Sequence, residues 1–210
     1  ALENEAISTS AIEGKILNRD SVKASIAKKF GFRDIDYNKI DNSIEYLIEV
    51  LIDANTNYDA KLTQERLFAW HGAIFPKAYD KFNAINVAIF RGEETMQVVG
   101  GYAGNEIVYY EAPPKSILEK EMQTFLNWFN STNDDLIKAC IAHLWFVIIH
   151  PFDDGNGRIA RAITDLVLSK IENSKISRLY SMSSAINDDR KGYYKALEYT
   201  TGYIKKEDNF

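Results

Sequence analysis

Apolar residues recur at three- and four-residue intervals between residues 136 and 149, and this pattern constrains the fold more than any other feature. The interval matches the repeat of an α-helix, in which such residues share one face. The pattern therefore predicts a central buried helix. Pro151 disfavours helical geometry at His150, so we expect the helix to end with this histidine at its tip. The predicted buried positions are Leu136, Ile137, Cys140, Ile141, Leu144, Trp145, Ile148 and Ile149.

Apolar periodicity predicts further helices on both sides of this segment. Asp41 or Asn42 is expected to cap one of them, and Ser116 another. Two short β-prone runs between residues 96 and 110 flank a glycine-rich turn, which predicts a β-hairpin. The fold class is therefore all-α, a helical bundle with one β-hairpin. The expected helices cover residues 2–14, 21–29, 40–52, 63–75, 116–129 and 159–171.

The composition is that of an ordinary globular chain. Its 210 residues can bury one substantial core, and its net charge of -5 argues against bulk binding to nucleic acid or to an anionic membrane. Cys140 is the only cysteine, and its apolar neighbours predict a buried thiol in a reducing compartment. No apolar run approaches the ~18 residues that span a bilayer, and residues 1–10 lack the basic cluster of a signal peptide. We expect a cytoplasmic protein with neither membrane nor nucleic-acid partners.

Residues 150–161 concentrate the groups that can carry chemistry. Gly155 and Gly157 permit a tight loop, with Asn156 between them, whose backbone N–H groups can converge on an anion. The loop opens a helix, and the first amides of a helix favour negative charge. Arg158 and Arg161 are three residues apart, so both can lie on one face and bind phosphate oxygens. The segment therefore predicts a phosphate-binding site.

His150 and Asp154 complete this site. A carboxylate beside a phosphate site is expected where it holds a divalent cation, which makes Asp154 a metal-ligand candidate. His150 at the rim of the loop can accept a proton from a nucleophile. The glycine spacing also matches a loose dinucleotide fingerprint, but that fingerprint requires a preceding strand. The helical periodicity before His150 excludes it.

The segment His150-Pro151-Phe152-Asp153-Asp154-Gly155-Asn156-Gly157-Arg158-Ile159-Ala160-Arg161 resembles the Fic motif H-x-F-x-[DE]-G-N-G-R-x-x-R at every specified position. The resemblance implies the Fic fold over about residues 38–202. It also implies that His150 deprotonates a hydroxyl of a target protein, which then attacks the α-phosphate of ATP and becomes adenylylated. We therefore expect an N-terminal segment at residues 1–37 and one compact catalytic domain at residues 38–210.

The resemblance also assigns roles within the motif. It implies that Asp154 binds Mg²⁺ and that Gly155-Asn156-Gly157 forms the anion hole. Arg158 and Arg161 would hold the phosphates of ATP, and Phe152 would anchor the loop in the core.

Outside the motif, the hairpin resembles the flap that lies over the active site of this family. A target segment would dock on its edge, near Val98 and Val99, by adding a strand. A plain surface hairpin is the alternative. Tyr193 and Tyr194 resemble the region near the adenine base, with core packing as the alternative.

Glu13 is a candidate inhibitory residue. It shares a helical stripe with Leu2, Ala6, Thr9 and Ile16, so its carboxylate should face the protein, where it requires a cationic partner. Thr9-Ser10-Ala11-Ile12-Glu13-Gly14 resembles the family's inhibitory motif [ST]-x-x-x-E-[GN]. The resemblance implies that Glu13 pairs with Arg161 and prevents productive seating of the γ-phosphate, with Thr9 and Gly14 completing the motif.

These observations predict an autoinhibited protein adenylyltransferase that uses Mg-ATP. Two alternatives stay open. One is a related enzyme that uses another donor or removes AMP, and the other is a non-catalytic nucleotide-binding regulator. A homodimer also stays open.

Overall fold

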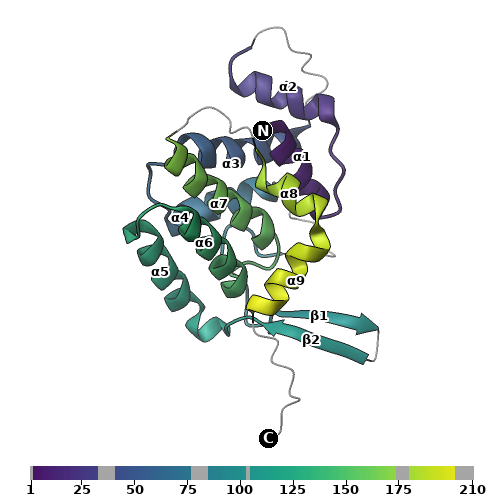
Figure 1. Cartoon of the computed structure of the whole chain (residues 1–210), viewed down its shortest axis with the longest axis vertical. Helices are drawn as coiled ribbons and strands as arrows, with labels where there is room; N and C mark the ends of the chain where they lie inside the picture. The colour runs from purple at the N-terminus through teal and green to yellow at the C-terminus, as the bar shows by residue number, and fades with distance from the viewer. Residues whose placement is uncertain (1, 33–40, 77–84, 103–104, 174–179, 202–210) are drawn as a thin grey trace, which may run out of the picture.

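The computed structural model describes residues 2–32, 41–76, 85–102, 105–173 and 180–201, which form a helical bundle with a hairpin at one end (Figure 1). The predicted fold class is confirmed. The two strands, β1 (Gln97–Tyr102) and β2 (Asn105–Glu111), pair antiparallel with an irregularity between Val98 and Val99. The helices are α1 (Leu2–Ile12), α2 (Arg19–Lys29), α3 (Asn42–Thr56), α4 (Gln64–Ile74), α5 (Lys115–Ser131), α6 (Leu136–Ile149), α7 (Asn156–Glu172), α8 (Met182–Asp188) and α9 (Arg190–Thr200).

Side-chain caps set several helix starts. Asp41 caps α3, because its Oδ1 accepts a hydrogen bond from the Ser43 N–H at 2.8 Å, as predicted. The prediction that Ser116 caps α5 is wrong, since this helix already begins at Lys115. Pro114 precedes it with φ of −64° and makes no side-chain cap, so the fixed proline geometry, rather than a hydroxyl, starts this helix.

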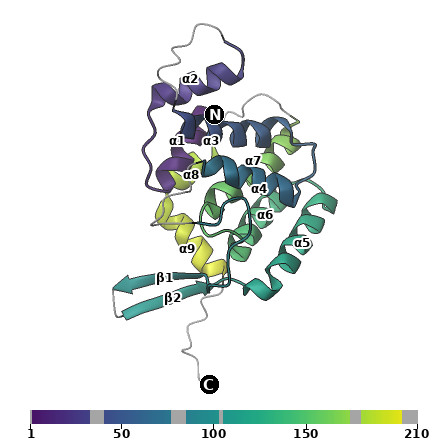
Figure 2. The ribbon, with the colours of Figure 1, turned by 180° about the vertical axis from the view of Figure 1, so that it is seen from behind.

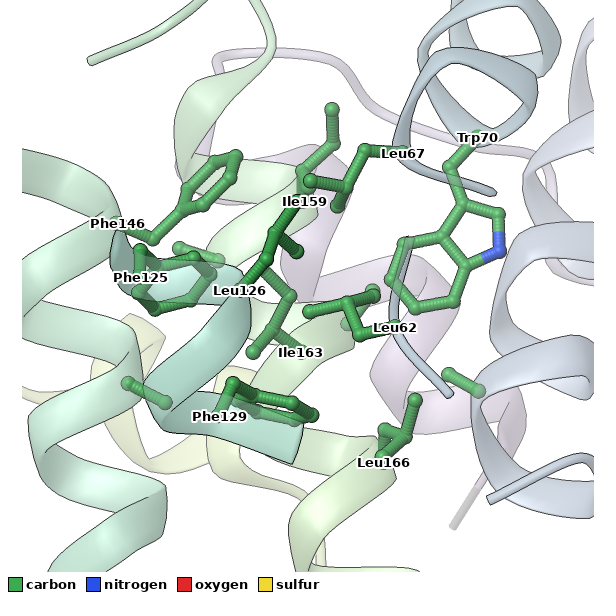
Figure 3. Packing of buried hydrophobic residues seen from close by; sticks show 14 of the residues in the cluster. Leu62, Leu67, Trp70, Phe125, Leu126, Phe129, Phe146, Ile159, Ile163 and Leu166 are labelled. Atoms are coloured by element: carbon green, nitrogen blue, oxygen red, sulfur yellow. The ribbon is translucent and has the colours of Figure 1, made fainter. Parts of the chain in front are cut away.

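The central helix of the bundle is α7, whereas the sequence predicted α6. Apolar residues of α7, Ile159 and Ile163, lie between aromatic residues of α5 and α6 on one side and Leu62 and Trp70 on the other (Figure 3). The buried side chains of this core come from α3 to α7 and from the segments between them, including Phe90 before β1 and Phe152 in the α6–α7 loop. Figure 3 labels Leu62, Leu67, Trp70, Phe125, Leu126, Phe129, Phe146, Ile159, Ile163 and Leu166. Burial of apolar surface at about 25 cal/mol per Å² makes this core the main stabilising element of the fold.

The predicted buried face of α6 is wrong for most of its positions. Leu136 and Ile137 are 64% and 68% exposed, and Cys140 is exposed as well. The apolar residues that α6 buries are Ala139, Ala142, Phe146 and Ile149. Both sets have helical spacing, and the two alanines allow α6 to pack closely against α7. Periodicity alone could not select between the two faces, because this helix is apolar almost all round.

A second cluster joins the first three helices around Ile48, with apolar residues from each of them. The buried members are Ala6, Val22, Ile44, Leu47, Ile48 and Leu51. The predicted helical stripe of α1 does not extend to Ile16, which is 97% exposed. The predicted boundary at residue 37 lies outside the described residues. None of the helices described is long and apolar enough to cross a membrane.

Candidate active site

The loop between α6 and α7 has a backbone that few other sequences could adopt. His150 ends α6 in the left-handed region with φ of 49°, and Gly155 starts α7 at φ of 80°. A Cβ on Gly155 would lie 2.7 Å from Phe75 Cε2, so glycine is required there. Asn156 closes the loop on itself, since its Nδ2 donates to the Phe152 carbonyl at 2.7 Å and its Oδ1 accepts from the Phe152 N–H at 3.0 Å. The amide side chain of Asn156 therefore shapes the loop.

Phe152 within this loop and His71 on α4 anchor the loop to the core. Phe152 is fully buried, as predicted, and the His71 ring stacks on it at a centroid distance of 4.2 Å. His71 Nδ1 accepts from the Ala88 N–H at 3.0 Å, so its Nε2 carries the proton and donates to the Asp154 carbonyl at 3.1 Å. Burial lowers the pKa of His71, which favours this neutral form. No motif pointed to His71, because it lies far from the loop in sequence.

The His150 imidazole has one ring nitrogen that is free to accept a proton, as the predicted base requires. Its Nδ1 lies 3.2 Å from the Val147 carbonyl, and a carbonyl can only accept, so Nδ1 carries the proton and Nε2 keeps a lone pair. Burial, above all other causes, lowers the pKa of His150 and favours the neutral ring. The helix C-terminus would favour the charged ring, so burial opposes this effect at the described site.

A pocket of about 530 Å³ brings most of the predicted residues together, and its size suits a nucleotide-sized ligand. One side is formed by the α6–α7 loop and the other by α9. The predicted residues that line it are Glu13, His150, Asp154, Gly155, Asn156, Gly157, Arg161, Tyr193 and Tyr194. A second pocket of about 330 Å³ lies between α1, α2 and α3 and contains none of the motif residues.

The two motif arginines occupy different surroundings. Arg161 is buried and lines the pocket. Arg158 lies over the Phe75 ring at 4.6 Å, with its Nη2 3.7 Å from Asp154 Oδ2. Its buried Nε makes no hydrogen bond within the described part of the chain. A buried donor without an acceptor is unfavourable, so Arg158 retains capacity to bind an anion.

Asp154 is the carboxylate positioned to hold a metal ion. Its side chain is 56% exposed, and its Oδ1 accepts the Gly155 N–H at 2.5 Å, which leaves lone pairs for a cation. The described residues include no group of three or more His, Cys, Asp or Glu that could hold a metal ion. Mg²⁺ commonly uses one or two carboxylates plus phosphate oxygens of the substrate. Asp154 therefore fits a magnesium ion that binds together with a nucleotide.

Glu13 contacts the pocket arginine directly. Arg161 Nη2 donates to Glu13 Oε1 at 2.7 Å, and its Nε donates to Thr9 Oγ1 at 2.8 Å. Gly14 follows in the left-handed region with φ of 75°, just after the end of α1. A Cβ on Gly157 would lie 3.0 Å from Glu13 Oε1, so a glycine there allows this close approach. Two residues of the predicted inhibitory motif, Thr9 and Glu13, thus contact the α7 arginine, and Gly14 follows them in the chain.

The helix that precedes Glu13, α1, is anchored to the C-terminal helices. Glu5 is buried and accepts hydrogen bonds from the Ser181 hydroxyl at 2.6 Å and the Ser183 N–H at 3.2 Å, at the start of α8. Arg190 Nη2 donates to the Ala11 carbonyl at 2.8 Å. Nothing in the sequence pattern singled out Glu5, whose partners lie far along the chain.

Tyr193 is tied to a buried histidine. Thr164 Oγ1 donates to the Ala160 carbonyl at 2.8 Å, so it accepts from His143 Nδ1 at 3.1 Å. His143 Nε2 then accepts from the Tyr193 hydroxyl at 2.9 Å. Burial lowers the pKa of His143 to about 4 and raises that of Tyr193 to about 12, which favours the neutral form of both. Tyr193 is thus both a packed residue and part of the pocket wall.

Tyr194 lies beside this pair and is more exposed. It is 54% exposed, and its ring makes an edge contact with Tyr193 at 5.4 Å. Both tyrosines line the pocket, as expected for residues near a base, and the role in adenine binding stays a prediction.

The hairpin lies at the end of the bundle beside α9 in both views (Figures 1 and 2). Tyr110 of β2 lines the pocket, and its hydroxyl donates to the Ile148 carbonyl. The backbone of Val98 and Val99 lies in β1, as predicted, while their side chains lie outside the described atoms. β1 pairs with β2 alone among the described strands, so its other edge is available for pairing.

Comparison with known proteins gives consistent matches. Residues 61–168, about half of the chain, match the Fic/DOC family, and residues 1–32 match a domain of unknown function, DUF4172. A probable protein adenylyltransferase of Aquifex aeolicus is 34% identical over 83 residues, covering 37% of this chain and 25% of that protein. The protein adenylyltransferase Fic of Nematostella vectensis is 23% identical over 172 residues, covering 77% of this chain and 36% of that protein.

Solved structures share the fold. A Fic family protein from Desulfovibrio desulfuricans superposes with a TM-score of 0.66 at 23% identity, covering 95% of this chain and 56% of that one. A Fic domain containing signaling protein from Bacteroides thetaiotaomicron has a TM-score of 0.65 at 18% identity, covering 93% and 70% respectively. The chain therefore spans only part of the relatives and structures it matches.

Proposed function

The chain belongs to the Fic/DOC family, and we propose that it is an autoinhibited protein adenylyltransferase. It would transfer AMP from Mg-ATP to a hydroxyl group of a target protein. The observation that carries this proposal is a pocket in which the neutral His150 imidazole, the Asp154 carboxylate and the buried Arg161 guanidinium meet. A base, a cation ligand and an anion site are the groups that nucleotidyl transfer to a hydroxyl requires.

The reaction follows from these positions. His150 Nε2 takes the proton of the target hydroxyl, whose oxygen forms a bond to the α-phosphorus of ATP. The bond from that phosphorus to the oxygen bridging the α- and β-phosphates breaks, and pyrophosphate leaves. The backbone amides at the start of α7 face the developing negative charge. Magnesium, when held by Asp154, neutralises charge on the phosphate oxygens.

The contact between Glu13 and Arg161 supports autoinhibition. The Glu13 carboxylate lies 2.7 Å from the Arg161 guanidinium and accepts a hydrogen bond from it, so an incoming γ-phosphate would compete with Glu13 for the same donors. Glu13 is the partner that can move, because its side chain is 31% exposed whereas that of Arg161 is 2% exposed. Release therefore requires Glu13 to leave the arginine, while Arg161 stays in place to bind phosphate.

A second candidate activity is removal of AMP from a modified target. Glu13 lines the same pocket as His150, and a carboxylate there could align a water molecule for attack on the phosphorus. Docking of the target on the edge of β1, a homodimer and a cytoplasmic location also stay predictions.

The decisive experiment incubates the protein with Mg²⁺ and ATP labelled at the α-phosphate, alone and in lysate. Glu13→Gly should label protein strongly, wild type weakly, and the Glu13→Gly/His150→Ala variant not at all. Glu3→Gly is the matched control, since Glu3 lies on the helix that precedes Glu13 but pairs with Arg19 away from the pocket. Absence of label in the folded, ATP-binding Glu13→Gly variant would contradict transfer. Loss of AMP from a labelled target would favour removal.

A further inference from the structure

The proposed base, His150, has a strained backbone conformation. His150 has a φ of 49°, a left-handed conformation that non-glycine residues rarely adopt. Such strain persists only where the surroundings hold it in place. The Phe146 carbonyl accepts the His150 N–H at 3.0 Å, which secures one side of the residue. The other side needs a partner from outside α6.

Arg91 supplies that partner. Its Nε donates to the His150 carbonyl at 2.8 Å, and its backbone N–H donates to the Pro151 carbonyl at 2.9 Å. The same side chain donates through Nη2 to the Pro113 carbonyl, beyond the end of β2. Arg91 thus donates to the carbonyls of His150 and Pro151, which follow α6, and to the carbonyl of Pro113, which follows the hairpin.

The charge of Arg91 points to more than packing. Arg91 is only 2% exposed, and no carboxylate of the described residues forms an ion pair with it. Burial lowers the pKa of the Arg91 guanidinium, and the Asp153 charge offsets this only in part, without forming an ion pair, so a neutral donor would avoid this cost if packing were the only role. Arg91 also repels a proton on His150 and thereby contributes to the lowered pKa of that imidazole.

The hairpin has a second contact with the chain near His150, made by Tyr110. The Tyr110 hydroxyl donates to the Ile148 carbonyl, two residues before His150. The hairpin and the base are therefore held to the same short stretch of chain, through Tyr110 at one point and Arg91 at the other.

We infer that Arg91 is a positioning residue that locks the His150 backbone and the base of the hairpin into one arrangement. A hydroxyl presented by a segment docked on the hairpin would then meet the imidazole at a fixed place. This inference rests on the proposed function and deepens it. A lysine could not replace Arg91, because one ammonium group cannot serve two carbonyls in the way that the planar fork does.

The test compares Arg91→Lys and Arg91→Gln, each in the Glu13→Gly background, with Arg66→Lys as the control. Arg66 also donates to backbone carbonyls, those of Asp53, Asn57 and Ala60, but lies away from the pocket. We expect both Arg91 variants to lower kcat about 10- to 100-fold, because a displaced base loses its geometry. The Kd for ATP should stay within about twofold, and Arg66→Lys should leave kcat unchanged.

A readout independent of activity uses NMR of the imidazoles, of which the chain has three. Arg91→Gln should raise the pKa of His150, because the repelling cation is gone, and Arg91→Lys should keep it nearer the original. Both should replace the single Nδ1–H tautomer of His150 by a mixture. Unchanged kcat together with an unchanged tautomer would overturn the inference. If Glu13→Gly itself shows no transfer, the proposed function fails, and the tautomer and titration alone decide the role of Arg91.

Discussion

Replacing Glu13 by glutamine measures how strongly the pocket arginine depends on its carboxylate partner. Glutamine keeps the size of the side chain, so no cavity forms, and only the negative charge is lost. Arg161 keeps both contacts to Thr9, through its Nε and its Nη2. A hydrogen bond to a charged group contributes roughly 1.5–3 kcal/mol, and the partial exposure of Glu13 reduces this to about 1–2 kcal/mol.

The chain contains a matched control for this measurement. Glu3 lies on α1, the helix that precedes Glu13, and pairs with Arg19 at 2.5 Å, and its side chain is 28% exposed against 31% for Glu13. The partners differ, since Arg19 is 58% exposed and Arg161 is 2% exposed. A surface pair of this kind contributes about 0.2–1 kcal/mol. Glu3→Gln should therefore change the free energy of unfolding less than Glu13→Gln does.

Thermal unfolding with and without ATP checks the prediction. A loss of about 1–2 kcal/mol corresponds to a fall in Tm of roughly 2–8 °C for a chain of this size. ATP at 100 times its Kd should then add about 2.7 kcal/mol to the Glu13→Gln variant. At the same ATP concentration, wild type should gain less free energy of unfolding, because ATP must first displace Glu13 and its apparent Kd is therefore higher. Equal losses for Glu3→Gln and Glu13→Gln, or equal gains with ATP, would refute the argument that Glu13 and phosphate compete for Arg161.

Two further predictions concern histidines. Burial lowers the pKa of His150 from its usual 6.5, and the proposed base acts when neutral, so the acid limb of the kcat profile of the released enzyme should have its midpoint below pH 6.5. A midpoint above 6.5 would contradict this. Tyr193→Phe removes the hydrogen bond to His143 and should lower the free energy of unfolding by about 1–2 kcal/mol in urea titrations, whereas Tyr199→Phe, at a position 90% exposed, should not. Equal stability of the two variants would show that the buried bond contributes nothing.

The sequence predicts the elements of this fold better than their packing. Periodicity and capping residues located α3, α4 and α7 closely, because those signals are local. The buried face of α6 could not be predicted, since the exposed stripe of Ile137 and Ile141 and the buried stripe of Ala139 and Ala142 both have helical spacing. Only contact with α7 distinguishes them, and the small side chain of Ala139 is the one that allows close approach.

The candidate site also contains residues that the sequence predicts and residues that it does not. The α6–α7 loop is contiguous in sequence, so His150 and the residues up to Arg161 can be recognised as a group from the order of the amino acids alone. The residues that hold the loop in place cannot. His71 and Arg91 reach it from other parts of the chain, and each is a single residue without a motif around it. Their roles depend on long-range contacts that a single sequence does not encode in a recognisable pattern.

The anchoring of α1 predicts how the proposed brake is released. Glu5 fixes the helix to the start of α8, whereas Glu13 lies beyond its last turn, so the carboxylate can leave Arg161 while α1 stays in place. A disulfide between cysteines at Ser8 and Ser184, whose hydroxyl oxygens are 3.0 Å apart, would lock the helix. With the exposed Cys140 replaced by serine, the oxidised enzyme should keep the same residual transfer as its reduced form. A loss of residual transfer that reduction restores would instead show that α1 itself must move.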